Sequence, residues 1–170
     1  MKKTLFKIPA VTPDGEFLAG YSENGLTELS FPHPGGRSAR AAKKEIIPAK
    51  MRGWHAATEA ALKKILAGRA PVKFPPLDLV GTDFQKKVWH ALRKISFGQT
   101  KSYGKIARAI GRPKAVRAVG GACGANPIPV LIPCHRVLAA NGKIGGFSGG
   151  LEWKRRLLAR EGICLSVGGS

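Results

Sequence analysis

The sequence has few cysteines, few acidic residues and no long hydrophobic run. No apolar stretch approaches the roughly 20 residues that a membrane-spanning helix needs. The basic N-terminal residues precede no apolar core of the kind found in secretory signals. We therefore expect a cytoplasmic protein with no membrane partner. The three cysteines form no CxxC pair, and their odd number favours free thiols over a disulfide framework.

Metal-ligand patterns and cofactor motifs are also missing from the sequence. His33, His55 and His90 are scattered along the chain without the spacing of zinc ligands. We therefore expect neither a metal site nor a cofactor.

Basic residues are abundant: 29 Lys and Arg face 10 Asp and Glu, which gives a net charge of +19. Residues 81–170 contain 16 basic and 3 acidic residues, whereas residues 1–80 contain 13 and 7. A basic surface favours a polyanion, because neutralised phosphates release counterions. Solubility or attraction to an anionic membrane surface would need the same charge, so composition alone does not choose between them.

The pattern of residues changes near position 80 and predicts two domains, 1–80 and 81–170. In the first, Asn24-Gly25 lies between two alternating segments, which is a strong hairpin signal. Residues 32–50 are rich in Pro, Gly and basic residues and predict a surface loop. A helix is expected from His55 to Gly68, because good helix formers end at a glycine. This half predicts a small α/β layer without chemistry.

The second half is predicted to be mostly helical. Asp83 is expected to cap its first helix, and Ser102 a second one that ends at Gly111. The apolar face of the first helix consists of Phe84, Val88, Leu92 and Ile95. Pro113 is expected at the first position of a third helix. Two helices joined by a three-residue turn suggest a helix-turn-helix, although two ordinary packed helices would give the same pattern.

The third predicted helix is nearly bare of bulky side chains, with Arg117 as its one large polar group. Its small residues are Ala115, Ala118, Gly120, Gly121 and Ala122. A helical glycine costs about 1 kcal/mol relative to alanine, so adjacent glycines favour close approach to another backbone. A thin helix could enter a groove of DNA while Arg117 reaches the base stack. Tight packing against another helix explains the glycines equally well.

Cys134 follows a rigid segment with three prolines between positions 127 and 133. Val130–Ile132 predicts a short buried strand that would aim the thiol. A buried cysteine is usually an inert small hydrophobe. Here a neighbouring imidazole in positive surroundings would lower the thiol pKa and produce a nucleophilic thiolate. Because neighbours on a strand point to opposite faces, His135 would reach the thiol only through a turn or a bridging water.

Cys123 and Cys164 lack this setting, and we expect both to be non-catalytic. The basic residues of "EWKRRLLAR" are expected to solvate a helix face. The core side of that helix is predicted to consist of Leu151, Leu158 and Trp153.

From Asp83 to Gly162 the sequence resembles the O6-alkylguanine-DNA alkyltransferases, also called methylated-DNA–protein-cysteine methyltransferases. "RAVGGACGANPIPVL", "IPCHRV" and "GGFSGGLEWKRRLLAREG" carry this resemblance, in this order. The implied α/β (α+β) fold has a small RNase H-like N-terminal domain followed by a winged helix-turn-helix-like domain. The implied reaction is one irreversible transfer of an alkyl group from O6-alkylguanine, or O4-alkylthymine, to a cysteine. It would follow minor-groove binding and base flipping in double-stranded DNA by a monomer, with clustering on DNA a further possibility.

The resemblance also implies roles for the residues at matching positions. Cys134 would accept the alkyl group, with His135 as its base through a water and Glu161 orienting the histidine. Asn126 would be a hinge, and Tyr103 would rotate the flanking phosphate and hydrogen-bond the flipped base.

Contacts with DNA and substrate are implied as well. Arg117 would fill the gap in the base stack, and Ser148 would donate to O6. The complete implied set is Ser102, Arg117, Ala118, Gly120, Arg136, Val137, Phe147, Ser148 and Gly149. Gly146 and Phe147 stand where some relatives carry Asn and Tyr, which could change the tolerance for bulky alkyl groups.

Two other classes of protein remain possible. A lesion-binding protein without chemistry would share the helix and the charge, but relatives of that kind lack the acceptor cysteine. A Cys–His hydrolase would use Cys134 and His135, yet it would need an oxyanion site and repeated turnover.

Overall fold

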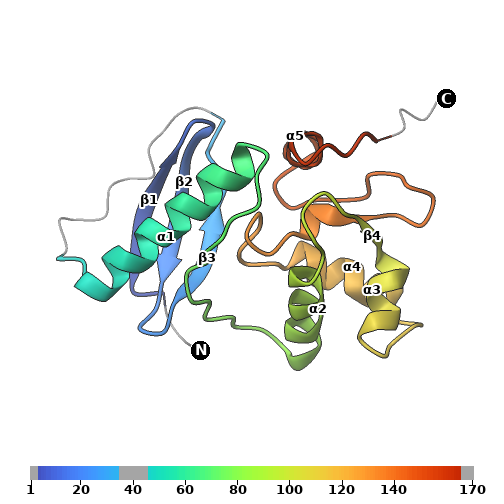
Figure 1. Cartoon of the computed structure of the whole chain (residues 1–170). Coiled ribbons are helices and arrows are strands. Elements are labelled where there is room, and N and C mark those ends of the chain that lie inside the picture. Colours follow the sequence, from blue (N-terminus) through green and yellow to red (C-terminus); the bar gives the residue numbers. More distant parts are fainter. Residues whose placement is uncertain (1–3, 35–45, 166–170) are drawn as a thin grey trace. The chain divides into compact units, whose positions relative to one another are not determined.

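The computed structural model of the chain describes residues 4–34 and 46–165 (Figure 1). These residues form a mixed α/β fold with five α-helices and two small sheets. The chain divides into two compact units, Met1–Val80 and Gly81–Ser170. No helix among the described residues is long and apolar enough to span a membrane. The greater part of the basic loop predicted at 32–50 lies outside the described residues.

The first unit contains a three-stranded antiparallel sheet. Its strands are β1 (Phe6–Thr12), β2 (Gly15–Tyr21) and β3 (Leu26–Ser30), in the order β1-β2-β3. Strands β2 and β3 pair in antiparallel fashion on either side of Asn24-Gly25, which confirms the predicted hairpin. Gly25 has φ 155°, and a Cβ there would collide with the Pro76 carbonyl. That carbonyl accepts the Leu26 amide at 2.8 Å, so the connector adds to the edge of β3.

Helix α1 (Ala49–Leu66) packs on this sheet (Figure 1). Its buried residues are Met51, Thr58, Ala61, Leu62, Ile65 and Leu66. The helix begins before the predicted start at His55. It ends at Leu66, and the predicted Gly68 follows the C-cap Ala67 with a φ of 70°, the left-handed conformation that glycine adopts readily.

The second unit begins with α2 (Asp83–Arg93), whose N-cap is Thr82 and not Asp83 as predicted. The Thr82 hydroxyl accepts the Gln85 amide at 3.2 Å, and the Gln85 side chain accepts the Thr82 amide at 2.9 Å. This reciprocal pair satisfies two of the free amides at the helix start better than Asp83 could from within the first turn. The predicted apolar face is confirmed for Val88, Leu92 and Ile95, which are buried, whereas Phe84 is half-buried.

Two further helices, α3 (Tyr103–Ala109) and α4 (Val116–Gly124), pack against each other and against α2. Ser102 caps α3 as predicted, since its hydroxyl accepts the Lys105 amide at 3.2 Å. Pro113 lies in the turn before α4, so its predicted place inside the helix is wrong. Buried Trp89 of α2 donates its indole N–H to the Ala122 carbonyl at 2.8 Å, which the bare surface of α4 makes possible.

Three short elements complete the second unit. Strand β4 (Lys101–Ser102) pairs in parallel with β5 (Val137–Leu138), which follows the 3₁₀ turn η1 (Cys134–Arg136). Helix α5 (Leu151–Arg160) contacts η1. Of the predicted core residues of α5, Leu158 is buried, Trp153 is half-buried and Leu151 is 40% exposed. Lys154 and Leu157 are buried as well.

Candidate active site

A tight turn, and not the predicted strand, leads to Cys134. Val130 has φ 73°, which is costly for a β-branched residue and closes the turn between Pro129 and Ile132. The buried Asn126 side chain holds this turn at both ends. Its Oδ1 accepts the Ile128 amide at 3.0 Å, and its Nδ2 donates to the Ile132 carbonyl at 2.9 Å. The side-chain bonds of Asn126 thus replace the strand pairing that Val130–Ile132 would have needed.

Cys134 is only 4% exposed and begins η1. The Asn126 amide nitrogen lies 3.1 Å from its sulfur and donates to it. Burial raises the pKa of the Cys134 thiol, while the Asn126 hydrogen bond, the Lys154 charge and the amides of Cys134 and His135 oppose this rise. The raised pKa contradicts the lowering that we expected from the basic surroundings, because desolvation outweighs them. The thiol therefore keeps its proton until a base removes it.

His135 is fully buried, and its Nε2 lies 2.8 Å from Oε1 of Glu161. Burial lowers the pKa of His135, although Glu161 opposes this shift. A neutral imidazole then donates its Nε2–H to Glu161, which leaves the lone pair on Nδ1. Among the residues that the structure describes, none hydrogen-bonds to Nδ1. This nitrogen is the one able to accept a proton.

Glu161 is the C-cap of α5 and anchors the buried network. Arg136 donates to both carboxylate oxygens, with Nε 2.9 Å from Oε2 and Nη2 3.0 Å from Oε1. The Gly98 amide adds a bond of 2.9 Å. Burial alone would raise the pKa of Glu161, but the hydrogen bonds from His135, Arg136 and Gly98 outweigh it and lower the pKa to about 2. The carboxylate is therefore charged and fixes the imidazole.

The guanidinium of Arg136, a residue predicted to bind DNA, lies inside this network. It also donates to the Ile95 carbonyl at 2.7 Å, and the residue is 7% exposed. A buried carboxylate needs a charged partner, and Arg136 supplies it. Val137, predicted to contact substrate, is fully buried in β5. The side chains of Arg136 and Val137 are thus buried in the protein interior and support the site from there.

Lys154 belongs to the site, although the sequence analysis placed it on a solvated face. It is fully buried, and its ammonium donates to the carbonyls of Val137 at 2.7 Å and Gly146 at 3.1 Å. Burial lowers the pKa of Lys154 to about 8, against the opposing effect of Cys134 and Cys123. Helical spacing could have identified Lys154, because it precedes the buried pair Leu157 and Leu158 by one turn.

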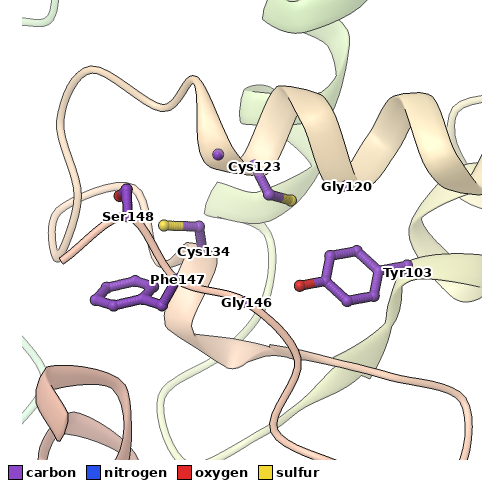
Figure 2. Close-up of a pocket in the computed structure, with 8 residues that line it drawn as sticks. Tyr103, Gly120, Cys123, Cys134, Gly146, Phe147 and Ser148 are labelled. Carbon is purple, nitrogen blue, oxygen red and sulfur yellow. The ribbon is translucent and has the colours of Figure 1, made fainter. Parts of the chain in front are cut away.

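A pocket of about 510 Å³ opens on the Cys134 sulfur. Its lining residues are Tyr103, Gly120, Cys123, Gly124, Cys134, Gly146, Phe147 and Ser148. Figure 2 shows the side chains of Tyr103, Cys123 and Cys134 entering this space from α3, α4 and η1, with Phe147 and Ser148 on the facing loop. Burial raises the pKa of the Cys123 thiol to about 12, so it stays protonated. Five of the predicted site residues thus line one pocket. Cys123, which was predicted to be non-catalytic, lines it as well.

The other predicted residues lie away from this lining. Arg117 and Ala118 are exposed on α4, Ser102 caps α3, and Gly149 follows the lining residue Ser148. Cys164 is exposed, outside the pocket. Within residues 4–34 and 46–165, no cluster of three or more His, Cys, Asp or Glu side chains could hold a metal ion.

The part of the chain that contains the site matches a known protein family. Residues 83–163 match the family model described as the DNA-binding domain of 6-O-methylguanine DNA methyltransferase. The methylated-DNA–protein-cysteine methyltransferase of Methanosarcina acetivorans is 56% identical over 84 residues, which cover 49% of this chain and 54% of that protein. The one from Mycobacterium bovis is 58% identical over 85 residues, which cover 50% and 52%. The chain thus spans about half the length of the curated relatives it matches.

Solved structures match over most of the chain. The Mycobacterium tuberculosis OGT crystallised in complex with DNA is 39% identical, with a TM-score of 0.72 over 91% of this chain and 90% of that one. An O6-methylguanine DNA methyltransferase from Methanococcus jannaschii is 28% identical, with a TM-score of 0.69 over 95% and 97%.

Proposed function

The chain belongs to the O6-methylguanine-DNA methyltransferase family, and from this premise we propose that it repairs alkylated DNA by transferring the alkyl group to Cys134. The substrate is double-stranded DNA that contains O6-alkylguanine, with O4-alkylthymine as a further lesion. The observation that carries this proposal is the position of the Cys134 sulfur. It lies at the pocket, held by Asn126 and next to the buried His135–Glu161 pair.

Binding must bring the lesion out of the base stack. The O6 substituent of a stacked guanine cannot reach a thiol that is 4% exposed within the protein. Extrusion of a nucleotide costs a few kcal/mol, and least for a poorly paired base, so damaged bases are favoured. Helix α4 carries exposed Arg117 and Ala118 beside its glycines, which suits entry into the minor groove while Arg117 fills the gap left in the stack.

Proton transfer activates the nucleophile. His135 takes the thiol proton on Nδ1 through a bridging water, and Glu161 stabilises the imidazolium that forms. The Asn126 amide and the Lys154 ammonium stabilise the thiolate. Asn126 therefore acts both on the turn that positions Cys134 and on its charge.

The thiolate then attacks the alkyl carbon in line, so that a sulfur–carbon bond forms while the carbon–O6 bond breaks. Guanine leaves best as a neutral base, which requires a proton donor at the ring. Burial raises the pKa of Tyr103, so its hydroxyl stays protonated and can donate from the pocket wall. Ser148 and Phe147 contact the base from the facing loop. Because a thioether has no good leaving group, each molecule acts once.

The proposal also covers the folds of the two units, the oligomeric state and the location in the cell. We assign an RNase H-like fold to the first unit and a winged helix-turn-helix-like fold to the second. We also propose a monomer in the cytoplasm that binds DNA through its charge of +19 and can cluster on it.

Intact-mass measurement after incubation with an O6-methylguanine oligonucleotide tests the proposal. We expect a gain of one methyl group, mapped to the Cys134 peptide and absent in Cys134→Ser. Cys164→Ser, an exposed cysteine outside the pocket, is the matched control and should be methylated like the parent. DNA binding with unchanged mass would instead indicate a lesion-binding protein, and repeated turnover would indicate a hydrolase.

A further inference from the structure

Helix α2 carries a row of basic side chains on the face away from its core. Residues three, four and seven apart share one side of a helix, and here that side is basic while Val88 and Leu92 are buried on the other. We call this row the basic stripe, and it consists of Lys86, Lys87, His90, Arg93 and Lys94. Lys86 is half-buried and the other four residues are exposed. The proposed alkyl transfer uses none of them.

The stripe lacks the acidic partners that cations have on two other helices. In α1, Nζ of Lys63 lies 3.5 Å from Oε2 of Glu59, and in α5, Nη2 of Arg156 lies 2.7 Å from Oε1 of Glu152. No side chain of the stripe forms an ion pair with any residue of 4–34 or 46–165. Like charges four residues apart destabilise a helix. The stripe therefore repels itself, and a bound polyanion would remove that repulsion.

The helix dipole explains only part of the stripe. Cations stabilise the last turn of a helix, and His90 and Arg93 lie in the last turn of α2. Lys86 and Lys87 lie in the first half of the helix, and the dipole effect falls off within one turn of each end. These two lysines thus gain no stabilisation from the helix itself, and their charges are available to a partner.

The stripe is a different face of α2 from the one that meets α4. Trp89 of α2 is buried and donates its indole N–H to the Ala122 carbonyl of α4 at 2.8 Å. Helix α3 also packs against α2 (Figure 1). The packed faces of α2 hold the helix that carries Arg117, and the stripe remains open to solvent.

We propose that the basic stripe binds the phosphate backbone of a second DNA duplex while α4 holds the first. From Lys86 to Lys94 the stripe extends about 12 Å, at a rise of about 1.5 Å per residue. Duplex DNA carries one negative charge per about 1.7 Å of its axis, so several phosphates face the stripe at once. Such contacts do not depend on base sequence. This surface goes beyond the proposed repair reaction, and it lets the protein pass between neighbouring duplexes.

The structure favours DNA over an anionic membrane as the partner. A helix that lies on a membrane inserts an apolar face between the lipids. In α2 the apolar residues Val88, Trp89 and Leu92 are buried inside the second unit. The helix therefore offers a partner its charge but no apolar face.

The test uses one duplex to capture another. An undamaged duplex is fixed to beads and loaded with the protein, and a fluorescent duplex is added after washing. We expect the parent protein to retain the second duplex, with an affinity that falls about 150-fold between 50 and 200 mM salt if the four Lys and Arg side chains each neutralise a phosphate. In the triple variant Lys87→Gln, Arg93→Gln, Lys94→Gln the slope of log affinity against log salt should fall by about three.

The matched control is a second triple variant, Lys64→Gln, Arg69→Gln, Lys73→Gln, which removes the same charge from exposed positions of the first unit. It should retain the second duplex as the parent protein does. If the stripe variant unfolds, Lys87→Gln alone serves, and its slope should fall by about one.

Failure of the parent protein to retain a second duplex would overturn this inference. Equal losses in the two triple variants would also overturn it, because net charge alone would then explain the capture. So would stripe-dependent binding to phosphatidylserine vesicles without capture of a second duplex, which would assign the stripe to a membrane. Methyl transfer to Cys134 should be the same in both triple variants and the parent. Capture of a second duplex by a parent protein that transfers no methyl group would overturn only the proposed function.

Discussion

Each unit of this protein contains a histidine next to a glutamate, and the two pairs differ in what surrounds them. In the first unit His55 uses both ring nitrogens, with Nδ1 3.1 Å from the Tyr21 hydroxyl and Nε2 3.6 Å from Glu59. In the second, His135 uses only Nε2 among the described residues, and a buried cysteine precedes it. A histidine whose nitrogens are both occupied holds α1 to the sheet, whereas one with a free nitrogen beside a thiol can move a proton.

The two His–Glu pairs also differ in burial. The side chains of His135 and Glu161 are 0% exposed, while those of His55 and Glu59 are 16% and 26% exposed. A buried carboxylate depends on its partners, because water cannot replace them. The residue pattern alone thus says little about chemistry, and the free nitrogen, the burial and the pocket distinguish the pair to which we assign the chemistry.

Replacing each histidine by glutamine gives the largest expected difference. His135→Gln removes the base and should slow methyl transfer by about 10²- to 10⁴-fold in a single-turnover assay. His55→Gln should leave the rate unchanged and lower the free energy of unfolding by about 1 kcal/mol. Equal losses of transfer rate in the two variants would contradict the distinction.

Replacing each glutamate tests the energetic contrast. Glu161→Gln leaves the buried Arg136 guanidinium without its charge partner, so the free energy of unfolding should fall by about 3–5 kcal/mol. Glu59→Gln should cost less than about 1 kcal/mol, since its pair is partly exposed. Urea denaturation followed by circular dichroism measures both values. Similar losses of unfolding free energy in the two variants would contradict the claim that the buried network depends more strongly on its charge pair.

Acid should weaken the second unit through the same glutamate. The folded pKa of Glu161, about 2, lies below its ordinary value of 4.5. Its stabilisation is therefore complete above pH 4.5 and is lost as the pH falls toward 2, on the order of 3 kcal/mol in all. The lowered pKa of buried His135 acts in the same direction, because the neutral form is favoured in the fold. Across this pH range the free energy of unfolding should depend less steeply on pH in Glu161→Gln than in the parent protein, and an unchanged dependence would contradict this assignment.

The smallest expected effect concerns Lys154, which is fully buried, whereas Lys63, the lysine that pairs with Glu59 in the first network, is 51% exposed. Lys154→Met should raise the apparent pKa of Cys134, because a nearby positive charge favours the thiolate. Iodoacetamide alkylation of Cys134 as a function of pH measures this shift without DNA. Arg155→Met, an exposed neighbour on α5, should not move it. An unshifted alkylation profile in Lys154→Met would show that the Lys154 charge does not stabilise the Cys134 thiolate.

Local patterns predicted much of the fold. Asn24-Gly25 located a hairpin, Ser102 located a helix start, and Val88, Leu92 and Ile95 marked a buried face. These features depend on residues close together in the sequence. The cap at Thr82 and the turn at Val130 were predicted wrongly, because a neighbouring residue offered an equally plausible local choice.

The sequence by itself determined the resemblance to the family, and that resemblance implied that Cys134, His135 and Glu161 share one site. Only the tertiary structure decided their chemical states. It buried the thiol and raised its pKa, and it turned Arg136 inward to Glu161. It also brought Lys154 under the pocket loop. The physical reason is that desolvation and charge pairing depend on every group within a few ångströms, and most of these groups lie far apart along the chain.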